Sequence, residues 1–354
     1  MAPSLPYHEP PIGTILVQSS FLIILNAINH VLDSILYSGL VGQILVGIAW
    51  GMPGGKFLEM HTQEVVVQLG YIGLILLVFE GGLSTSLSDL KANLFLSILV
   101  ALTGIIAPMG LSFILAPLVR ASPVQAFTAG AALCATSLGT TFTLLGSSGL
   151  SSTRLGVVLT SAAMMDDIVG LIMVQVIANF GSSPSLDAVT VIRPVFVSLA
   201  FAVLLPLACR FIALPATRFL ASKREHNPDS LLSKCLQHEL LALAIHSCTL
   251  VAMVAGATYA GSSSLLGAYI AGAVISWWDV AAPHCWSGEK SSVSRNAHDS
   301  GDASANICSP VAHPSNSGSA VFEKYYRPAL QRVLKPFFFV CKLQHLGEPH
   351  INGL

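Results

Sequence analysis

Two adjacent carboxylates lie inside a long apolar segment. Asp166 and Asp167 stand near the middle of the run 155–178, whose other residues are apolar or small. A helix of about 20 residues crosses the ~30 Å hydrocarbon core of a bilayer, so this run is long enough to span a membrane. Ionisable side chains at that depth are costly and mark ion or proton pathways. The pair is the candidate cation- and proton-binding site.

The two carboxylates cannot serve the same partner. Neighbouring residues of a helix point about 100° apart, so one carboxylate can face an aqueous cavity while the other meets a different helix. Neighbouring carboxyls titrate as a coupled pair. A carboxylate that binds either a proton or a small cation, but not both, is the minimal machinery of an exchanger.

The composition predicts an all-α polytopic membrane protein. Of the 354 residues 53% are hydrophobic and 10% charged, whereas soluble domains carry about 25% charged residues. The net charge of −1 gives no sign of nucleic-acid binding, and no cofactor is expected. The seven cysteines form no C-x-x-C pair, so we predict no metal site beyond the transported cation. Apolar runs of spanning length cover 12–32, 36–51, 65–82, 94–119, 123–146, 154–179, 193–214, 237–257 and 260–279.

The rest of the chain differs from these runs. Residues 1–279 form the expected transmembrane domain, and residues 280–327 are rich in Ser, Asn and His, which predicts a disordered loop. Apolar character returns over 328–340, the expected start of a tenth helix. Residues 341–354 form a polar tail with several ionisable side chains, which cannot continue a membrane helix.

Hydroxyl and small side chains interrupt the fifth apolar run at Thr136, Ser137, Gly139 and Thr140. Such residues weaken a regular helix. In transporters, broken helices line the ion site, whereas a packing seam of small residues is the alternative. We predict a broken-helix crossing here. Glu80, at the end of the third run, fits an interfacial position better than a transport role, and stays a minor candidate.

Four segments in order resemble the monovalent cation:proton antiporter family, which includes Kef-type potassium exchangers and bacterial sodium/proton antiporters. They are FEGGL at 79–83, ATSLGT at 135–140, MDDIVG at 165–170 and SLLGAYIAG at 264–272. The resemblance covers roughly residues 30–280, and LKPFFF at 334–339 looks like the opening of the next family helix. The resemblance implies a bundle of about thirteen helices with two inverted repeats, a core moving against a scaffold, and a homodimer. It also implies exchange of Na+ or K+ against H+.

Family positions give individual residues expected roles. By its place in the motif, Asp167 would bind the cation or the proton, and Asp166 would be its neighbour, which pairs with a lysine on a later helix in electrogenic members. Thr136 and Ser137 would lie at the broken-helix crossing. The second repeat would supply a second crossing, but the family resemblance ends at 339. We therefore expect a C-terminally truncated, inactive form.

Three other classes of protein remain alternatives. An intramembrane aspartyl protease needs two aspartates on facing helices, which adjacent residues do not provide. A symporter of the same fold for an organic anion fits two carboxylates poorly. A non-transporting remnant agrees with the expected truncation.

The basic residues predict the orientation of the chain. Loops after the first, third, fifth, seventh and ninth runs carry most of the Lys and Arg, and such loops face the cytoplasm. Whichever membrane houses the protein, this places residues 280–327 on its cytoplasmic side and the N-terminus outside.

Single-cysteine labelling checks this orientation. In a cysteine-free background, Ser291→Cys should react with an impermeant maleimide only after the membrane is permeabilised, because residues 280–327 face the cytoplasm. Lys56→Cys, on the opposite face, should react in intact cells. Labelling of Ser291→Cys from outside would show that the predicted orientation is wrong.

Overall fold

The computed structural model describes the chain over most of its apolar part, and within this part it contains helices and turns but no strand. The described residues are 11–36, 39–51, 54–85, 93–135, 145, 150, 153–180, 188–213, 215, 239–281 and 317–341. The all-α architecture expected from composition is therefore confirmed. The chain divides into two compact units, and each is described by itself.

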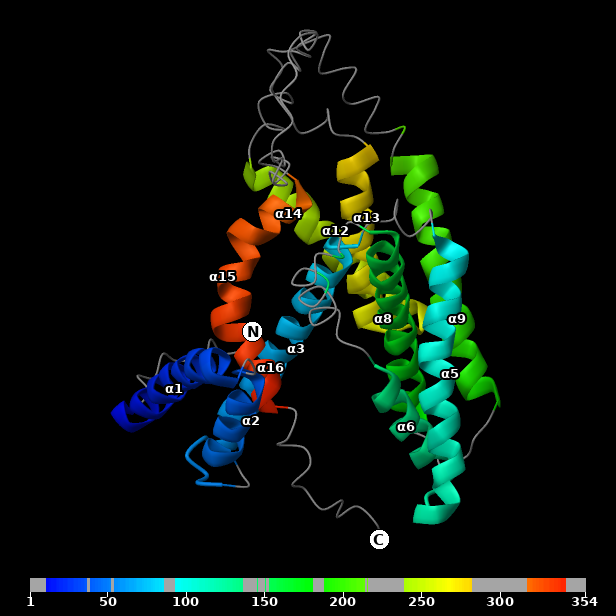
Figure 1. Cartoon of the computed structure of the whole chain (residues 1–354). Coiled ribbons are helices and arrows are strands. Elements are labelled where there is room, and N and C mark those ends of the chain that lie inside the picture. Colours follow the sequence, from blue (N-terminus) through cyan, green and yellow to red (C-terminus); the bar gives the residue numbers. More distant parts are fainter. Residues whose placement is uncertain are drawn as a thin grey trace, which may run out of the picture. The chain divides into compact units, whose positions relative to one another are not determined.

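The first unit joins the two ends of the chain. It comprises residues 1–77 and 323–354. Its helices are α1 (Ile12–Leu36), α2 (Gly39–Trp50), the first part of α3 (Met60–Leu83), the π-helical turn η4 (Leu330–Leu334), and the helices α15 (Arg327–Ala329) and α16 (Lys335–Cys341). In Figure 1, α2 lies beside α16, although almost 300 residues separate them along the chain.

Aromatic and branched side chains hold α16 in this unit. Phe337 and Val340 are buried in one cluster with Phe21 and Leu25 of α1. The rings of Phe21 and Phe337 stack with centroids 6.3 Å apart. Gly47 lets α2 approach α16 closely, because a Cβ at position 47 would lie only 3.0 Å from backbone atoms of Val340. The apolar segment predicted to begin a tenth helix thus packs as part of the core of this unit.

The second unit comprises residues 78–322. Beside the end of α3 it contains α5 (Leu94–Val119), α6 (Pro123–Cys134), α8 (Arg154–Phe180), α9 (Ala188–Ala208), the π-helical turn η1 (Cys209–Ala213), α12 (Glu239–Ala260), α13 (Ser264–Ala281) and α14 (Gly318–Val321). α5, α6, α8 and α9 run side by side in Figure 1. α6 starts with a capping box, in which Ser122 and Gln125 each bind the other's backbone N–H.

α13 is the most enclosed helix of the second unit, and two glycines make this possible. A Cβ at Gly267 would lie 2.7 Å from the carbonyl oxygen of Met253 in α12. A Cβ at Gly272 would lie 2.7 Å from the backbone nitrogen of Leu83, and closer still to the carbonyl oxygen of Phe79. These two glycines therefore permit close helix packing. Gly272 brings α13 against the end of α3.

A helical segment begins at Gly318, ten residues earlier than the start expected at residue 328. Ser317 caps it by accepting a hydrogen bond from the backbone N–H of Ala320 (3.3 Å). The Asp279 carboxylate, in the last turn of α13, accepts one from the backbone N–H of Gly318 (2.6 Å). A carboxylate is stabilised at a helix N-terminus. This pairing of distant residues is invisible to composition, which assigned all of 280–327 to a loop.

Six helices of the described part are long and apolar enough to cross a membrane. They are Ile12–Leu32, Met60–Leu83, Leu94–Val119, Arg154–Ala178, Leu240–Ala260 and Ser264–Ala281. α2, α6 and α9 account for the other three runs that the sequence predicted as spans. Of these, α6 stops at Cys134, well before the expected end at residue 146. The protein is therefore an integral membrane protein with several spans.

Gly272→Ala should destabilise the protein by about 1–3 kcal/mol, the usual cost of overpacking. The added methyl group meets backbone atoms of α3, which cannot rotate away as a side chain can. Gly104→Ala in α5 is the matched control, because a Cβ there meets nothing within 4 Å. Thermal unfolding in detergent measures both. Equal melting temperatures for the two variants would contradict the close contact.

Asp279→Ala should destabilise the protein by about 1 kcal/mol, the typical loss of a helix cap. Asp279→Asn retains a side-chain oxygen acceptor and should lose less. Unfolding of the purified proteins in detergent measures the stability lost by each variant. Added salt should reduce the difference between Asp279→Ala and the wild type, because salt screens the Asp279 charge. An Asp279→Ala protein as stable as the wild type would show that the Asp279–Gly318 contact contributes nothing.

Candidate functional site

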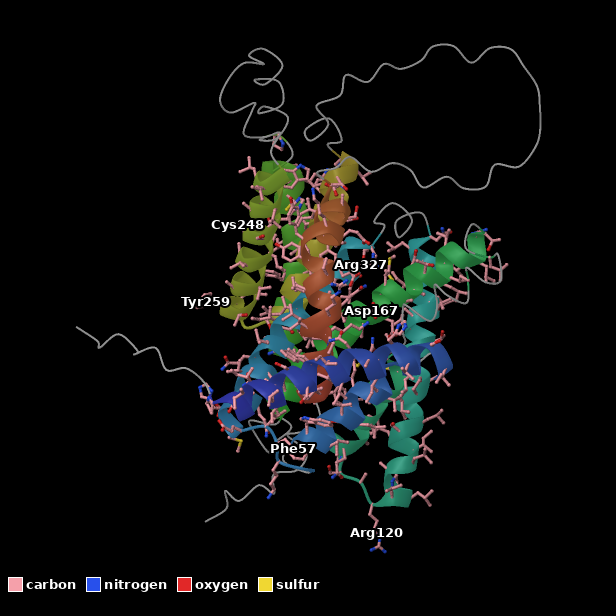
Figure 2. The ribbon with its side chains drawn as sticks, turned by 90° about the vertical axis from the view of Figure 1, so that its left-hand side faces the viewer. Phe57, Arg120, Asp167, Cys248, Tyr259 and Arg327 are labelled. Atoms are coloured by element: carbon pink, nitrogen blue, oxygen red, sulfur yellow. The ribbon has the colours of Figure 1, made fainter. Side chains whose placement is uncertain are left out.

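The two aspartates stand at the middle of α8, which packs against α5, α9 and α13. From α5, the Ser97 hydroxyl donates to the carbonyl oxygen of Val158 (3.4 Å). From α13, a cluster around Leu266 packs against Ile168 and the residues one turn further along α8. Figure 2 labels Asp167 part way along this helix. The contacts with α5 and α13 thus hold the middle of α8, where the carboxylates lie, in place.

Asp166 and Asp167 address different parts of the second unit. Asp166 is buried, with 8% of its surface exposed, and interacts electrostatically with Cys134 at the end of α6. Asp167 is partly buried and interacts electrostatically with Tyr269 of α13. Their divergence follows from their adjacent positions on one helix. The carboxylates also repel each other. A proton or cation on either one would relieve that repulsion.

The regular part of α6 ends directly before the hydroxyl-rich segment. Cys134 is its last residue, and Ala135 has an extended backbone (φ −64°, ψ 118°). The predicted broken-helix crossing at Thr136, Ser137, Gly139 and Thr140 lies outside the described residues. Since Asp166 interacts with Cys134, the end of α6 lies on the Asp166 side of the site.

Glu80, the minor candidate, lies in the last part of α3 and is partly buried. Its carbonyl oxygen accepts a hydrogen bond from the backbone N–H of Ser84 (3.1 Å), which closes the end of the helix. Within the described part of the chain, no three His, Cys, Asp or Glu side chains gather as a metal site would require. The carboxylate oxygens of Asp166 and Asp167 are ligands of the kind that hard cations take.

The sequence pattern did not single out two hydroxyl residues on the α13 side of the site. The Tyr269 hydroxyl lies 2.9 Å from the hydroxyl of Thr85, and both side chains are buried. One signal could have revealed Tyr269, because its hydroxyl is a polar group in the middle of the otherwise small and apolar 264–272 segment. Thr85 gave no such signal, since it follows the end of α3 in a Ser-rich stretch that resembles an ordinary loop.

Comparison with known proteins identifies the family. Residues 19–289 match the transmembrane sodium/hydrogen exchanger family. The chain belongs to this family. The resemblance to monovalent cation:proton antiporters inferred from short motifs is thereby confirmed. Because members of the sodium/hydrogen exchanger family are transporters, the intramembrane protease alternative falls away.

Curated antiporters are similar to part of this exchanger-family chain. The Na+/H+-K+ antiporter GerN of Bacillus cereus is 32% identical over 152 residues, which cover 43% of this chain and 39% of the relative. A high-affinity Na+/H+ antiporter of Synechocystis is 31% identical over 166 residues, 46% of this chain and 36% of the relative. A Na+/H+ antiporter of Enterococcus hirae is 27% identical over 239 residues, 67% of this chain and 58% of the relative. The chain spans about two fifths of the length of the first two relatives.

Proposed function

We propose that this protein exchanges a monovalent cation, Na+ or K+, for protons across a membrane. The observation that carries the proposal is the pair of carboxylates at the centre of α8, a helix long and apolar enough to span the bilayer. The similarity to Na+/H+ antiporters supports it. Two adjacent negative charges attract a cation and repel an anion, so the organic-anion symporter has no comparable support.

Competition at Asp167 would couple the two ions. A bare carboxylate in a medium of low dielectric constant is costly, and the nearby charge of Asp166 adds to that cost. Either a proton or a cation removes much of this cost, but one carboxylate does not bind both at once. The site therefore favours its two occupied forms over the empty one, and this preference suppresses leakage of charge without exchange.

The remaining site residues complete the proposal. Asp166 would set the charge of the empty site from the α6 side, where it interacts with Cys134. The hydroxyl-rich segment at 136–140 would supply the broken-helix crossing, with its carbonyl groups near the ion. Glu80 would act only at the end of α3. A homodimer, with the N-terminus outside and residues 280–327 in the cytoplasm, is part of the same proposal.

Asp167→Asn should abolish cation-dependent proton flux, because an amide neither titrates nor offers a charge to the cation. The measurement is dye-reported pH change in sealed proteoliposomes after addition of Na+ or K+. Glu64→Gln is the matched control: it makes the same carboxylate-to-amide change at an exposed position of α3 and should leave the rate unchanged. Flux at the wild-type rate in Asp167→Asn would refute the assignment of the site.

Asp166→Asn should be milder than Asp167→Asn. It removes one negative charge from the site but retains the carboxylate that binds the ion. Exchange should persist at a reduced rate, and the charge moved in each cycle should shift toward electroneutral exchange. A membrane-potential dye in the same vesicles reports this change. If Asp166→Asn abolished cation-dependent proton flux while Asp167→Asn kept the wild-type rate, Asp166 would be the ion-binding carboxylate and Asp167 its neighbour.

A further inference from the structure

One face of α13 packs closely against the end of α3. Tyr269, Gly272 and Ser276 are spaced i, i+3 and i+7, so they share a helix face. Gly272 contacts the backbone of α3, and the Ser276 hydroxyl donates to the carbonyl oxygen of Thr85 (3.2 Å). Gly82 contributes from the other side, because a Cβ there would collide with the carbonyl oxygen of Tyr269. The two backbones therefore approach closely enough for the Thr85 and Tyr269 side chains to meet.

The hydrogen bonds of this pair fix the direction of its protons. Each hydroxyl has a single proton to donate. The Thr85 hydroxyl donates to the carbonyl oxygen of Gly81 (3.1 Å). The 2.9 Å contact between Thr85 and Tyr269 is then made by the Tyr269 proton. A third contact, from Tyr269 to the carbonyl oxygen of Met164, is 3.5 Å long and correspondingly weak. Tyr269 thus directs its proton to Thr85, and none of the described residues donates a hydrogen bond to the remaining lone pairs of its oxygen.

The Tyr269 oxygen lies on the face of α8 that carries Asp167. It approaches the carbonyl of Met164, and residues i and i+3 of a helix lie on the same face, so Met164 and Asp167 share that face. The electrostatic interaction between Asp167 and Tyr269 is an independent sign of the same proximity. With 4% of its surface exposed, Tyr269 cannot satisfy its oxygen with bulk solvent.

We propose that Tyr269 sets the cation affinity of the Asp167 site: its hydroxyl, oriented by Thr85, presents oxygen lone pairs to the ion that the carboxylate binds. This inference rests on the proposed function and names one ion-binding residue for it, Tyr269, and one positioning residue, Thr85. Lone pairs beside a carboxylate oppose its empty, charged form and favour a form that carries a cation. Removal of the Tyr269 oxygen should therefore weaken cation binding, while the exchange step itself, carried out by Asp167, stays intact.

The test separates affinity from rate. In proteoliposomes, Tyr269→Phe should raise the KM for Na+ or K+ about tenfold, the change expected for the loss of one contact of hydrogen-bond strength, with little change in the maximal rate. Thr85→Val keeps the shape of the side chain but leaves the Tyr269 proton without its acceptor, so it should raise KM in the same direction. Thr85→Ser keeps the hydroxyl and should restore the wild-type KM.

Binding to the purified protein provides a second readout that does not require transport. Cation binding stabilises the folded protein by an amount set by the ratio of cation concentration to Kd. A tenfold higher Kd in Tyr269→Phe should therefore require about ten times more NaCl than the wild type for the same rise in melting temperature, with choline chloride as the blank. The double variant Tyr269→Phe with Thr85→Val should be no worse than either single variant, because both remove one interaction. Tyr259→Phe is the matched control, since Tyr259 is 93% exposed and projects from α12 in Figure 2.

Three outcomes would overturn the inference. One is an unchanged KM in Tyr269→Phe while Asp167→Asn abolishes exchange, which would leave the proposed function standing without this residue. Another is a lower KM in Tyr269→Phe, which would show that the hydroxyl proton, not the lone pair, faces the carboxylate. The third is additivity of the two substitutions, which would mean that Tyr269 and Thr85 act separately. If Tyr269→Phe fails to fold, the comparison of Thr85→Val with Thr85→Ser decides alone.

Discussion

The cost of holding two carboxylates in an apolar helix is the constraint on which the second unit depends. Asp166 and Asp167 repel each other at the centre of α8, and Asp166 is buried. Two neighbouring helices bring polar side chains near the pair: Cys134 at the end of α6 lies near Asp166, and Tyr269 of α13 lies near Asp167. In the proposed mechanism, such a site would be least stable when empty, which is the property an exchanger needs.

Close backbone contact between α3 and α13 gives the site its second side. Glycines at positions 82 and 272 remove the side chains that would hold the helices apart, and the hydroxyls of Thr85 and Ser276 then bridge the contact. Packing and polarity are thus linked at this point, because a bulkier residue at position 272 would also separate Thr85 from Tyr269. The stability and the cation affinity of the protein are expected to change together there.

In the helical segment 317–341, local sequence pattern predicts one end of the helix and a tertiary contact stabilises the other. Apolar side chains such as Phe337 and Val340 predicted a helix in the last part of this segment, and they pack in the core of the first unit. Its beginning at Gly318 is capped by Ser317 and also by Asp279, which lies 39 residues earlier in the chain. No periodicity within 280–327 could reveal a cap supplied from so far away.

The sequence by itself determined the membrane class, the helical runs and the adjacent carboxylates, because hydrophobic length and charge inside an apolar run are local properties. It also determined that Asp166 and Asp167 diverge, since neighbouring positions on a helix always do. Only the tertiary structure decided which elements they face, and it alone brought Thr85 to Tyr269. That pairing joins residues 184 positions apart, and such a contact follows from how the backbones pack, which no single segment encodes.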